Sequence, residues 1–477
     1  MKKTLLLSAI LFLGVHGMKA ESTDYPQVYA FDEMGDINGI SDNGQYGALT
    51  DPDNGLAYIW NVSNPEVLTE ITAVGGQNFN GTAGAFVTTA NDVSDAGVVV
   101  GSVLLGEVTT PAYYKDGQWN LLPLHQSARA TNEAVCITPD GKIIAGYQFI
   151  NDPSSDIGGR YYPCQWFLNE EGGYDLKAYT DLDLPNHQGF FPMTQTPDGE
   201  VIAGTVYCGI QSMINAILKN GKLILFDEIV TKTEVFEYRG KYYAGEDENG
   251  KQIWVDDIND PRVVYFPEVY IDGYRDSQSL IGYFANCDSN GNLYGARNRV
   301  ENVDEEGNGE VYMDACIYNY KTDTWYTDSQ WSAFSAGIGD KTLFTLNGTV
   351  IKDGEVADVQ EAYDVWVPGT VEGISKISAD ATVLGGVSSE FFEGLGVTYY
   401  YPFFVVTGEG AGVEAVTGDP KKGLVVTYPG RIDVLNADEI AVYDLDGRLV
   451  GKDKVNYVNP GIYVVKAGDA TYKVIVR

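Results

Sequence analysis

Short runs of alternating apolar and polar residues follow one another along the chain after its first twenty residues, and Gly, Asn, Asp and Pro separate them. Alternation with a period of two is typical of β-strands with one buried face, and the separating residues are typical of tight turns. Amphipathic stretches with a period of 3.6 residues, which would indicate helical repeats, are absent from the sequence. The pattern therefore predicts an all-β protein made of short strands.

One unit recurs through residues 35–406. Each copy contains a strand-like run, a Ser or Thr, a turn of the Asp-Gly type and a β-branched run that ends in Gly. The clearest copies are 35–49, 88–102, 133–147, 191–205 and 373–387, the copy at 285–297 is looser, and 236–247 and 337–349 keep only the turn and the next strand. A further strand of the form Ala-x-x-Trp, or an equivalent, follows several turns. Trp60, Trp166 and Trp254 fall on this strand, which predicts that they lie in the core.

The spacing of the turns indicates the architecture. They lie near residues 44, 97, 141, 199, 240, 291, 340 and 381, at intervals of 41 to 58 residues, and a β-propeller blade takes about 40–50 residues. Two of the eight units are weak, so the pattern predicts a seven- or eight-bladed β-propeller over residues 21–408. The last unit has no fourth strand of its own, and we expect residues 26–33 to supply it and close the ring.

The repeat also resembles a known type. Its Ser/Thr-x-Asp-Gly-x-x-x-x-Gly motif, followed by Ala-x-x-Trp, resembles the HAF-type extracellular repeats of exported bacterial proteins. The resemblance implies a propeller but no reaction. The motif departs from the Asp box of sialidases, because Asp140 and Asp198 directly precede Gly141 and Gly199 and no Thr-Trp follows.

The C-terminal region differs from the repeats. Residues 424–477 alternate with a period of two between Gly, Asn and Pro clusters, which predicts a small β-sandwich after a Gly-rich linker at 409–423. The segments 442–448, 460–465 and 473–476 resemble the C-terminal (Por) sorting domain of type IX secretion cargo. This resemblance implies a Bacteroidetes-like cell and secretion machinery as a partner. The alternative is a generic sandwich module without a role in transport.

The N-terminus predicts export. Lys2 and Lys3 precede the apolar stretch 5–15, which is too short to cross a hydrocarbon core of ~30 Å, so residues 1–20 are expected to be a signal peptide. No later segment approaches 18 uninterrupted apolar residues, and we expect no membrane insertion. The expected location is the periplasm, the outer-membrane surface or the extracellular space.

Charge narrows the range of partners. The 31 basic and 67 acidic residues give a net charge of −36. Removing residues 1–20 takes away three lysines and leaves 28 basic residues against 67 acidic ones, or −39. Residues 412–477 hold nine of each sign, so the whole excess lies on 21–411. Such a surface repels phosphate backbones, which excludes nucleic acids and favours a neutral or cationic partner, either a glycan or a protein.

Cysteine and histidine offer little chemistry. The five cysteines leave two alternatives open: disulfides within repeats, Cys136–Cys164 and Cys287–Cys316, or small buried side chains on strands. After the leader only two histidines remain, and no zinc, nucleophile-elbow or phosphate-loop motif is present. No catalytic residue can be assigned, which favours a non-catalytic protein.

Two groups of residues are candidates for binding. Asp51 with Asp53, and Asp288 with Asn290 and Asn292, offer closely spaced oxygen ligands that suit calcium, the one cofactor the sequence suggests, although Asp and Asn beside Gly also form plain turns.

Trp331 and Trp366 lie outside the repeat pattern, so they are candidates for stacking on sugars, with core packing as the alternative. Our leading hypothesis is an exported, non-catalytic binding or scaffold protein whose propeller presents a ligand surface. The alternative is a propeller-type glycoside hydrolase or lyase. It would use paired carboxylates in the central funnel, contributed by different blades and therefore invisible to local motifs.

Overall fold

A computed structural model describes most of the chain. The described residues are 26–31, 35–51, 55–72, 86–153, 155, 158–182, 187–208, 212–247, 250–275, 280–392, 397–407, 424–428, 431–435, 440–444, 448–458, 461–467 and 470–476. The expected signal peptide and the linker at 409–423 lie outside these residues. In the described part of the chain, no helix is both long enough and apolar enough to cross a membrane.

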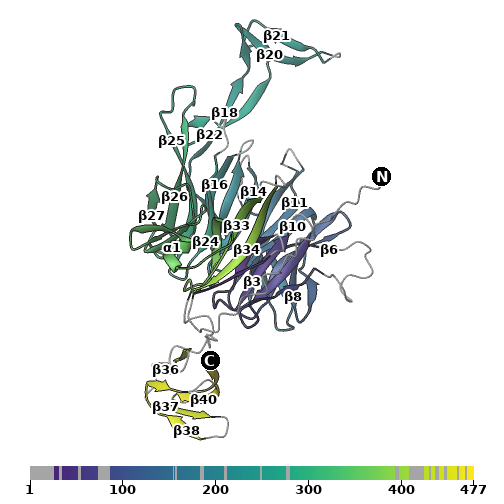
Figure 1. Ribbon diagram of the computed structural model, residues 1–477. Coiled ribbons are helices and arrows are strands. Elements are labelled where there is room, and N and C mark those ends of the chain that lie inside the picture. The colour runs from purple at the N-terminus through teal and green to yellow at the C-terminus, as the bar shows by residue number, and fades with distance from the viewer. Residues whose placement is uncertain are drawn as a thin grey trace, which may run out of the picture.

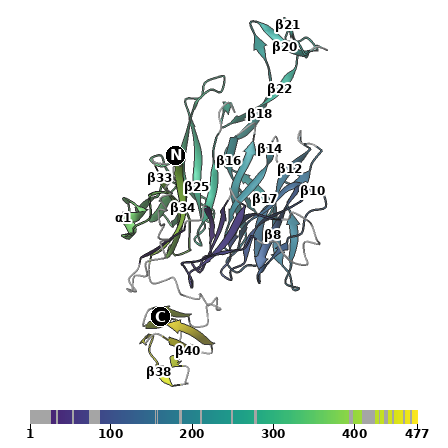
Figure 2. The ribbon, with the colours of Figure 1, turned by 45° about the vertical axis from the view of Figure 1, so that its right-hand side comes forward.

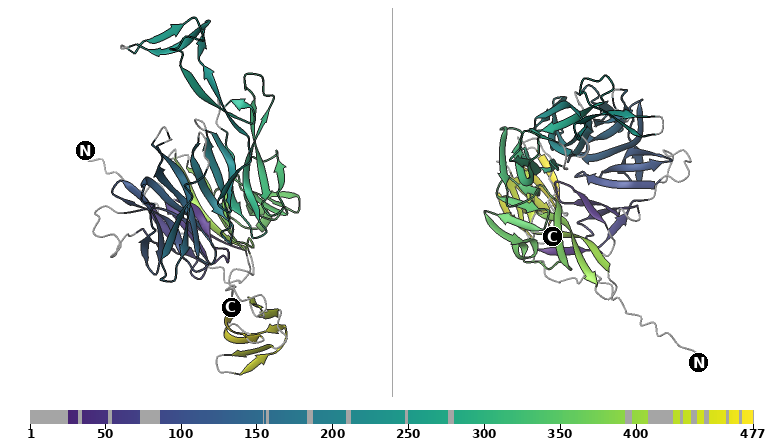
Figure 3. Two further views of the ribbon diagram at one scale, coloured as in Figure 1. Left: turned by 180° about the vertical axis from the view of Figure 1, so that it is seen from behind. Right: turned by 90° about the horizontal axis from the view of Figure 1, so that it is seen from above.

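Seven blades of four antiparallel strands surround a common axis, so the chain forms a seven-bladed β-propeller (Figure 1; Figure 3, right). The innermost, first strands of blades 1 to 7 are β2 (Asp36–Ile40), β6 (Phe86–Val93), β10 (Ala128–Ile137), β14 (His187–Gln195), β24 (Tyr283–Cys287), β28 (Phe334–Ile338) and β32 (Thr370–Ile377). The second strands are β3 (Tyr46–Asp51), β7 (Val99–Leu105), β11 (Ile143–Asn151), β15 (Val201–Cys208), β25 (Asn292–Glu301), β29 (Thr342–Thr345) and β33 (Val383–Phe392).

The third and fourth strands complete the sheet of each blade. The third strands are β4 (Leu56–Asn61), β8 (Val108–Lys115), β12 (Gly159–Leu168), β16 (Ser212–Lys219), β26 (Glu310–Asn319), β30 (Thr349–Lys352) and β34 (Val397–Val406). The fourth strands are β5 (Leu68–Glu70), β9 (Gln118–Leu121), β13 (Tyr174–Ala178), β17 (Lys222–Leu225), β27 (Thr324–Asp328), β31 (Glu355–Asp358) and, for blade 7, β1 (Gln27–Ala30). One short helix, α1 (Val359–Tyr363), follows blade 6.

The N-terminal strand closes the ring. β1 pairs antiparallel with β34, from Gln27 opposite Val406 to Ala30 opposite Phe403. The expectation that residues 26–33 supply the missing fourth strand is confirmed for this strand. The two ends of the sequence repeat are therefore joined by backbone hydrogen bonds within blade 7.

The repeated motif forms the turn between the first and second strands of a blade. In blade 3 the Thr138 hydroxyl donates to Asp140 (2.8 Å) and accepts the N–H of Ile143 (3.0 Å). Gly141 follows with a φ of 71°, a left-handed conformation that glycine adopts at little cost. In blade 7 the equivalent position is occupied by Ala381, with a φ of 53°. The motif is a turn signal.

Two of the repeat tryptophans are core residues, as expected. Trp60 and Trp166 are fully buried (0% exposed), and their indole N–H groups donate to the carbonyls of Pro65 (2.9 Å) and Pro123 (2.8 Å). Trp60 also stacks on Phe404 of blade 7, with ring centroids 4.2 Å apart. Trp60 therefore helps to hold blade 1 against the closing blade.

Between blades 4 and 5 the chain leaves the ring as an arm (Figures 1 and 2). The arm is a ribbon of β18 (Ile229–Val235) and β22 (Tyr265–Ile271) with a short β23 (Tyr274–Arg275). It carries a tip sheet of β19 (Glu237–Tyr238), β20 (Lys241–Glu246) and β21 (Gln252–Val255).

The arm corrects two expectations. The unit at 236–247 is not a blade, because its sheet has only three short strands and stands on the arm. Trp254 lies on β21, where its ring contacts Phe236, Tyr238 and Tyr243 at centroid distances of 5.6 to 5.9 Å. It packs in the arm tip and not in a blade core.

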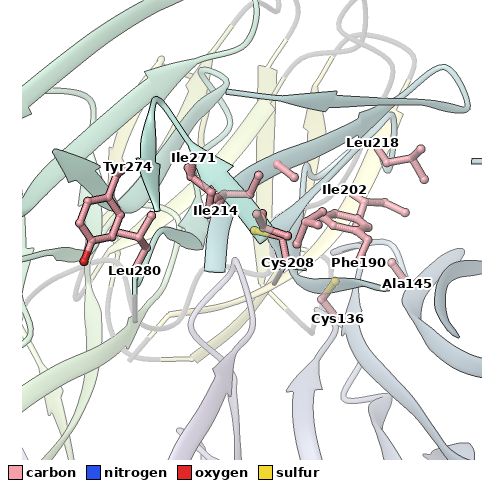
Figure 4. Packing of buried hydrophobic residues seen from close by; sticks show 13 residues of the cluster. Cys136, Ala145, Phe190, Ile202, Cys208, Ile214, Leu218, Ile271, Tyr274 and Leu280 are labelled. Atoms are coloured by element: carbon pink, nitrogen blue, oxygen red, sulfur yellow. The ribbon is translucent and has the colours of Figure 1, made fainter. Parts of the chain in front are cut away.

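The base of the arm is anchored in a buried cluster of blade 4 (Figure 4). Ile271 and Tyr274 of the arm pack there with Phe190, Ile214 and other apolar side chains of blade 4. All four are almost completely buried. The ribbon is therefore fixed to the propeller by hydrophobic burial at its base.

Seven strands follow the propeller in two sheets, which matches the expected C-terminal sandwich (Figure 1). One sheet contains β35 (Leu424–Tyr428), β36 (Arg431–Leu435) and β39 (Val455–Tyr457), and the other β38 (Leu449–Gly451), β37 (Ile440–Asp444), β40 (Gly461–Ala467) and β41 (Ala470–Val476). Ile432, Val434, Val442 and Val465 are buried.

The five cysteines are all free, and four are buried. The second of the two alternatives, small buried side chains on strands, is the one found. Burial raises the pKa of Cys164 and of Cys316 well above its ordinary value, so both thiols stay protonated at neutral pH.

Candidate functional site

A cavity of about 1060 Å³ runs along the propeller axis, and residues from all seven first strands line it. The first strands begin at the face from which the arm projects, since the arm lies between the last strand of blade 4 and the first strand of blade 5. We call this the arm face. The opposite face, where the first strands end, carries the repeated turns and is called the turn face; β34, the last strand of the propeller, also ends there (Figure 2).

The repeat places equivalent residues at equal heights along the cavity. Two rings of lining residues can be defined by their distance from the turn residue at the glycine position. The upper ring lies near the arm face and contains Asp36, Glu133, Phe191, Tyr283 and Glu372. Each of these residues lies eight positions before the turn residue of its blade, except Glu372 of blade 7, which lies nine positions before it. A lower ring near the turn face, five residues before it, contains Asp92, Cys136, Thr194, Asn286 and Lys376. A β-bulge in β32 accounts for the extra residue in blade 7.

Aromatic rings cover one side of the upper cavity. Tyr147, Tyr161, Phe191 and Tyr207 from blades 3 and 4 line it and contact one another. The ring centroids are 5.1 Å apart for Tyr147–Phe191, 4.7 Å for Tyr161–Phe191 and 5.0 Å for Phe191–Tyr207. All four side chains are only partly buried. We call this group the aromatic wall.

Glu133 joins the aromatic wall to the carboxylates of the upper ring. It faces Tyr147 across the β10–β11 pair, and the Tyr147 hydroxyl donates to its Oε2 at 2.6 Å. Its Oε1 accepts from Thr89 (3.0 Å) and from the Asn91 amide (2.9 Å). Burial, and then the Glu133 charge, raise the pKa of Tyr147, so its hydroxyl remains a donor. These bonds fix the Glu133 carboxylate at the wall.

The lower ring combines a carboxylate with an amine. The Oδ atoms of Asp92 accept the N–H groups of Val93 and Ile137, both at 2.9 Å. Burial raises the pKa of Asp92 to about 6, although the Lys376 ammonium and these N–H groups act to lower it. Lys376 donates to the Ala285 carbonyl at 3.4 Å. It is the only basic residue among the described lining residues.

Asp42 lies beyond the lower ring, in the turn of blade 1. Its side chain accepts no hydrogen bond from any described residue. Burial, followed by the charges of Asp95, Asp92 and Asp380, raises its pKa to about 7. At neutral pH this carboxyl is therefore partly protonated, as a general acid requires.

Two lining amides keep unused hydrogen-bonding atoms. Gln195 is only 5% exposed, and its Nε2 donates to the carbonyls of Cys136 (3.2 Å) and Ile143 (3.0 Å). These two bonds orient the amide and leave Oε1 without a partner in the described part of the chain. Asn286 Nδ2 is likewise unpartnered there. Because buried polar groups are normally satisfied, the cavity is suited to a ligand with both donors and acceptors.

The sequence candidates for sugar stacking do not line this cavity. Trp331 packs partly buried against the core of blades 5 and 6, which includes Tyr294 and Phe334. Trp366 is 74% exposed, after helix α1. The structure therefore does not bring the two indoles into the aromatic wall.

The candidate calcium ligands fall into two separate places. Asp51 is buried at the end of β3, near the arm face, and Asp53 lies outside the described residues. Asp288, Asn290 and Asn292 share the turn of blade 5 on the turn face.

Asp288 is engaged within its own turn. It accepts from the N–H groups of Asn290 and Asn292, from the Asn292 amide, from the Tyr294 hydroxyl and from Gly339 N–H, at 2.7 to 3.1 Å. Burial favours the neutral acid, but these bonds lower the pKa of Asp288. No group of three His, Cys, Asp or Glu residues suited to a metal occurs among the residues that the structure places. Calcium binding stays a prediction.

Sequence reasoning missed the residues of the aromatic wall and the upper ring. They come from several blades, and only Glu133 and Tyr147 share one copy of the repeat, 133–147. The signal that would have found them is positional: Asp36, Glu133, Phe191 and Tyr283 each precede the turn glycine of their own repeat by eight residues. Aligning the repeats on that glycine places these four residues at one position.

The chain was compared with family models, curated proteins and solved structures. No family model and no curated protein matches the chain. Among solved structures, the chain is similar to TolB from Acinetobacter baumannii (15% identity, TM-score 0.28, 40% of this chain and 42% of that chain). It is also similar to an oligogalacturonate lyase from Vibrio parahaemolyticus (10%, 0.32, 79% and 91%) and to the Dos1 propeller (10%, 0.36, 80% and 95%). The chain spans less than half of the length of that TolB. At these identities and scores, the likenesses assign no function.

Proposed function

We propose that this chain is an exported, non-catalytic binding protein that takes a glycan at the arm-face mouth of its central cavity. The observation that carries the proposal is the aromatic wall of Tyr147, Tyr161, Phe191 and Tyr207. Partly exposed tyrosine rings present an apolar face and a polar rim, as sugar rings do. The cavity volume of about 1060 Å³ is large enough for an oligosaccharide segment.

The polar lining supports the same choice. Glu133 provides acceptors at the mouth, and the amides of Gln195 and Asn286 line the cavity nearer the turn face. Sugar hydroxyls are donors and acceptors at once, so they can satisfy such a mixed set. The sequence adds two proposals: the leader at 1–20 directs export, and the sandwich at 424–477 carries the protein through secretion machinery to the outer-membrane surface or beyond.

Titration calorimetry against defined hexasaccharides tests the binding. The probes are the hexamers of glucose, mannose, xylose and N-acetylglucosamine. We expect one of them to bind, and Tyr161→Leu to weaken that binding about tenfold, because an aromatic contact contributes ~0.5–1.5 kcal/mol beyond its buried area. The matched control is Tyr326→Leu, which changes a tyrosine that is 46% exposed on an outer strand. Binding by none of these hexamers nor by a charged derivative of them, or equal loss in the two variants, would refute the proposal.

Catalysis is the second candidate, and one observation favours it. Asp42 and Asp92 interact electrostatically at the turn-face end of the cavity, and burial raises the pKa of Asp42 to about 7. Glycoside hydrolysis uses a pair of carboxyl groups, of which the general acid has a raised pKa. The same incubations should therefore be assayed for reducing ends and unsaturated products. Release that Asp42→Asn abolishes would replace the binding function by hydrolysis or elimination.

A further inference from the structure

The charges that line the cavity are strongly unbalanced. Six carboxylates line it, against the single amine of Lys376; they are Asp36, Asp42, Asp92, Glu133, Asp288 and Glu372. A cavity of one sign with low-dielectric walls concentrates ligands of the opposite sign. The lining therefore favours a positively charged ligand over a neutral one of the same shape.

The lower ring shows how the cavity holds an ammonium group. Lys376 places its amine there, bonded to the Ala285 carbonyl at 3.4 Å, and its charge acts on Asp92 of blade 2 as well as on Cys287 of blade 5. The amine thus offsets the charge of the Asp92 carboxylate from across the cavity. In the lower ring, the positive charge is therefore supplied by the Lys376 side chain of the protein itself.

The upper ring has three carboxylates and no such cation. Asp36, Glu133 and Glu372 form no ion pair with any described residue, and partial burial raises the pKa of Asp36. Glu372 accepts from the Ser389 hydroxyl, and Glu133 from three uncharged donors. Hydrogen bonds from neutral groups leave their negative charges uncompensated at the mouth.

The aromatic wall stands beside these carboxylates. A cation over the face of a tyrosine ring is attracted to it, and more strongly when water is excluded. The chain uses this contact elsewhere: the Lys177 amine lies 4.6 Å from the Tyr179 ring centroid, and that of Lys232 lies 3.7 Å from the ring centroid of Tyr270. At the mouth, the rings and Glu133 can act on the same ammonium group.

A second, independent feature is a buried hydrogen-bond acceptor without a partner in the described part of the chain. The Oε1 atom of Gln195 is buried and unpartnered among the described residues, while its amide nitrogen is held by two carbonyls. A buried acceptor without a partner is destabilising. Gln195 lines the cavity on the same strand as Phe191, four residues nearer the turn face.

We infer that the glycan bound at the mouth is an amino sugar with free amines, whose ammonium groups lie between the aromatic wall and the carboxylates of Asp36, Glu133 and Glu372. The inference rests on the glycan-binding function proposed above and names its substrate class. A flat sugar ring meets the tyrosines, and its charged amine meets the uncompensated carboxylates. Lysine side chains of a protein would offer the same ammonium without the ring, and they are an outcome of the test.

The experiment compares two probes of one length, the glucosamine hexamer and its N-acetylated form, by calorimetry at pH 6 and low salt. We expect the glucosamine hexamer to bind at least tenfold more tightly. Glu133→Gln should weaken binding of the glucosamine hexamer several-fold more than binding of the N-acetylated hexamer, and so reduce this ratio, whereas Tyr161→Leu should weaken both by the same factor. The matched control is Glu170→Gln, an exposed glutamate beyond the third strand of the same blade. Circular dichroism checks that each variant is folded, and Glu372→Gln is the second variant of the ring.

The outcomes separate the inference from the function on which it rests. If the two hexamers bind equally, or the N-acetylated one more tightly, while Tyr161→Leu weakens both, the amino-sugar inference fails and the glycan function stands. If Glu133→Gln and Glu170→Gln change the ratio equally, the inference also fails. If neither hexamer binds and a lysine-rich peptide does, both proposals are overturned.

Discussion

Asp42 links the stability of the propeller to pH. Its carboxyl lies in the turn after β2, close to the carboxylates of Asp92, Asp95 and Asp380, and its side chain has no hydrogen bond with a described residue. Burial first, and then these charges, raise its pKa from 3.8 to about 7 in the folded state. A fully exposed carboxyl in the unfolded chain keeps the ordinary value. The folded protein therefore binds more protons than the unfolded one between about pH 4 and pH 7.

The sign and size of the effect follow from this difference. Because the folded pKa is raised, stability falls as pH increases through this window and reaches its lower level above the folded pKa. Between pH 5 and pH 8, ionisation in the folded state would cost up to about 3 kcal/mol at 1.36 kcal/mol per pKa unit, and ~2 kcal/mol after allowance for solvent screening of a partly exposed group. Asp42→Asn removes the charge and hence this loss.

Urea unfolding at pH 5 and pH 8, followed by tryptophan fluorescence, measures the effect. We expect the stability advantage of Asp42→Asn over the parent to be ~2 kcal/mol larger at pH 8 than at pH 5. Asp353→Asn is the control, because it removes the same charge from an exposed hairpin turn where φ is 51°. If the parent and Asp42→Asn lose equal stability between the two pH values, or if the control behaves like Asp42→Asn, the reasoning is refuted.

Two further changes test the turn signal and the closure of the ring. Gly141→Ala forces alanine into a φ of 71°, so we expect a loss of ~1 kcal/mol in the urea-derived free energy of unfolding, whereas Gly173→Ala, which has no positive φ and meets only ordinary contacts, should be neutral or slightly stabilising. Equal effects would contradict the conformational explanation. Trp60→Ala removes the ring stacked on Phe404 at 4.2 Å and should cost ~3–5 kcal/mol, seen as a lower melting temperature. A loss under 1 kcal/mol would show that this contact is not needed for closure.

The sequence predicted those parts of the fold that depend on local chemistry. The Thr138–Asp140–Gly141 turn forms from residues that are neighbours in the chain, so its motif could be recognised and counted. The same locality explains the extra unit at 236–247. It has a turn and a strand of the right kind, but only the complete structure shows that its sheet stands on the arm and not in the ring.

The candidate site forms only when the ring of blades closes, so its residues could not be predicted from local sequence. Glu133 and Tyr147 are fourteen residues apart and meet across one strand pair, but Asp36 and Glu372 reach the same cavity from blades 1 and 7. Their common function arises from the curvature of the ring, which period-two alternation does not encode. Tryptophan is rare in this chain, so Trp331 and Trp366 stood out as candidates, whereas the aromatic wall consists of Tyr and Phe, which are common.

The pairing of β1 with β34 also determines when the ring of blades can close during folding. Ala30 pairs with Phe403, so the first and last strands of the ring must both be free of the ribosome and of any translocation pore before blade 7 forms. Until then β34 presents an open edge, a ready template for pairing with another chain. β1 must remain available for pairing while all the other blades assemble. Loss of residues 27–30 would thus act at a distance, because it would remove the strand that closes blade 7.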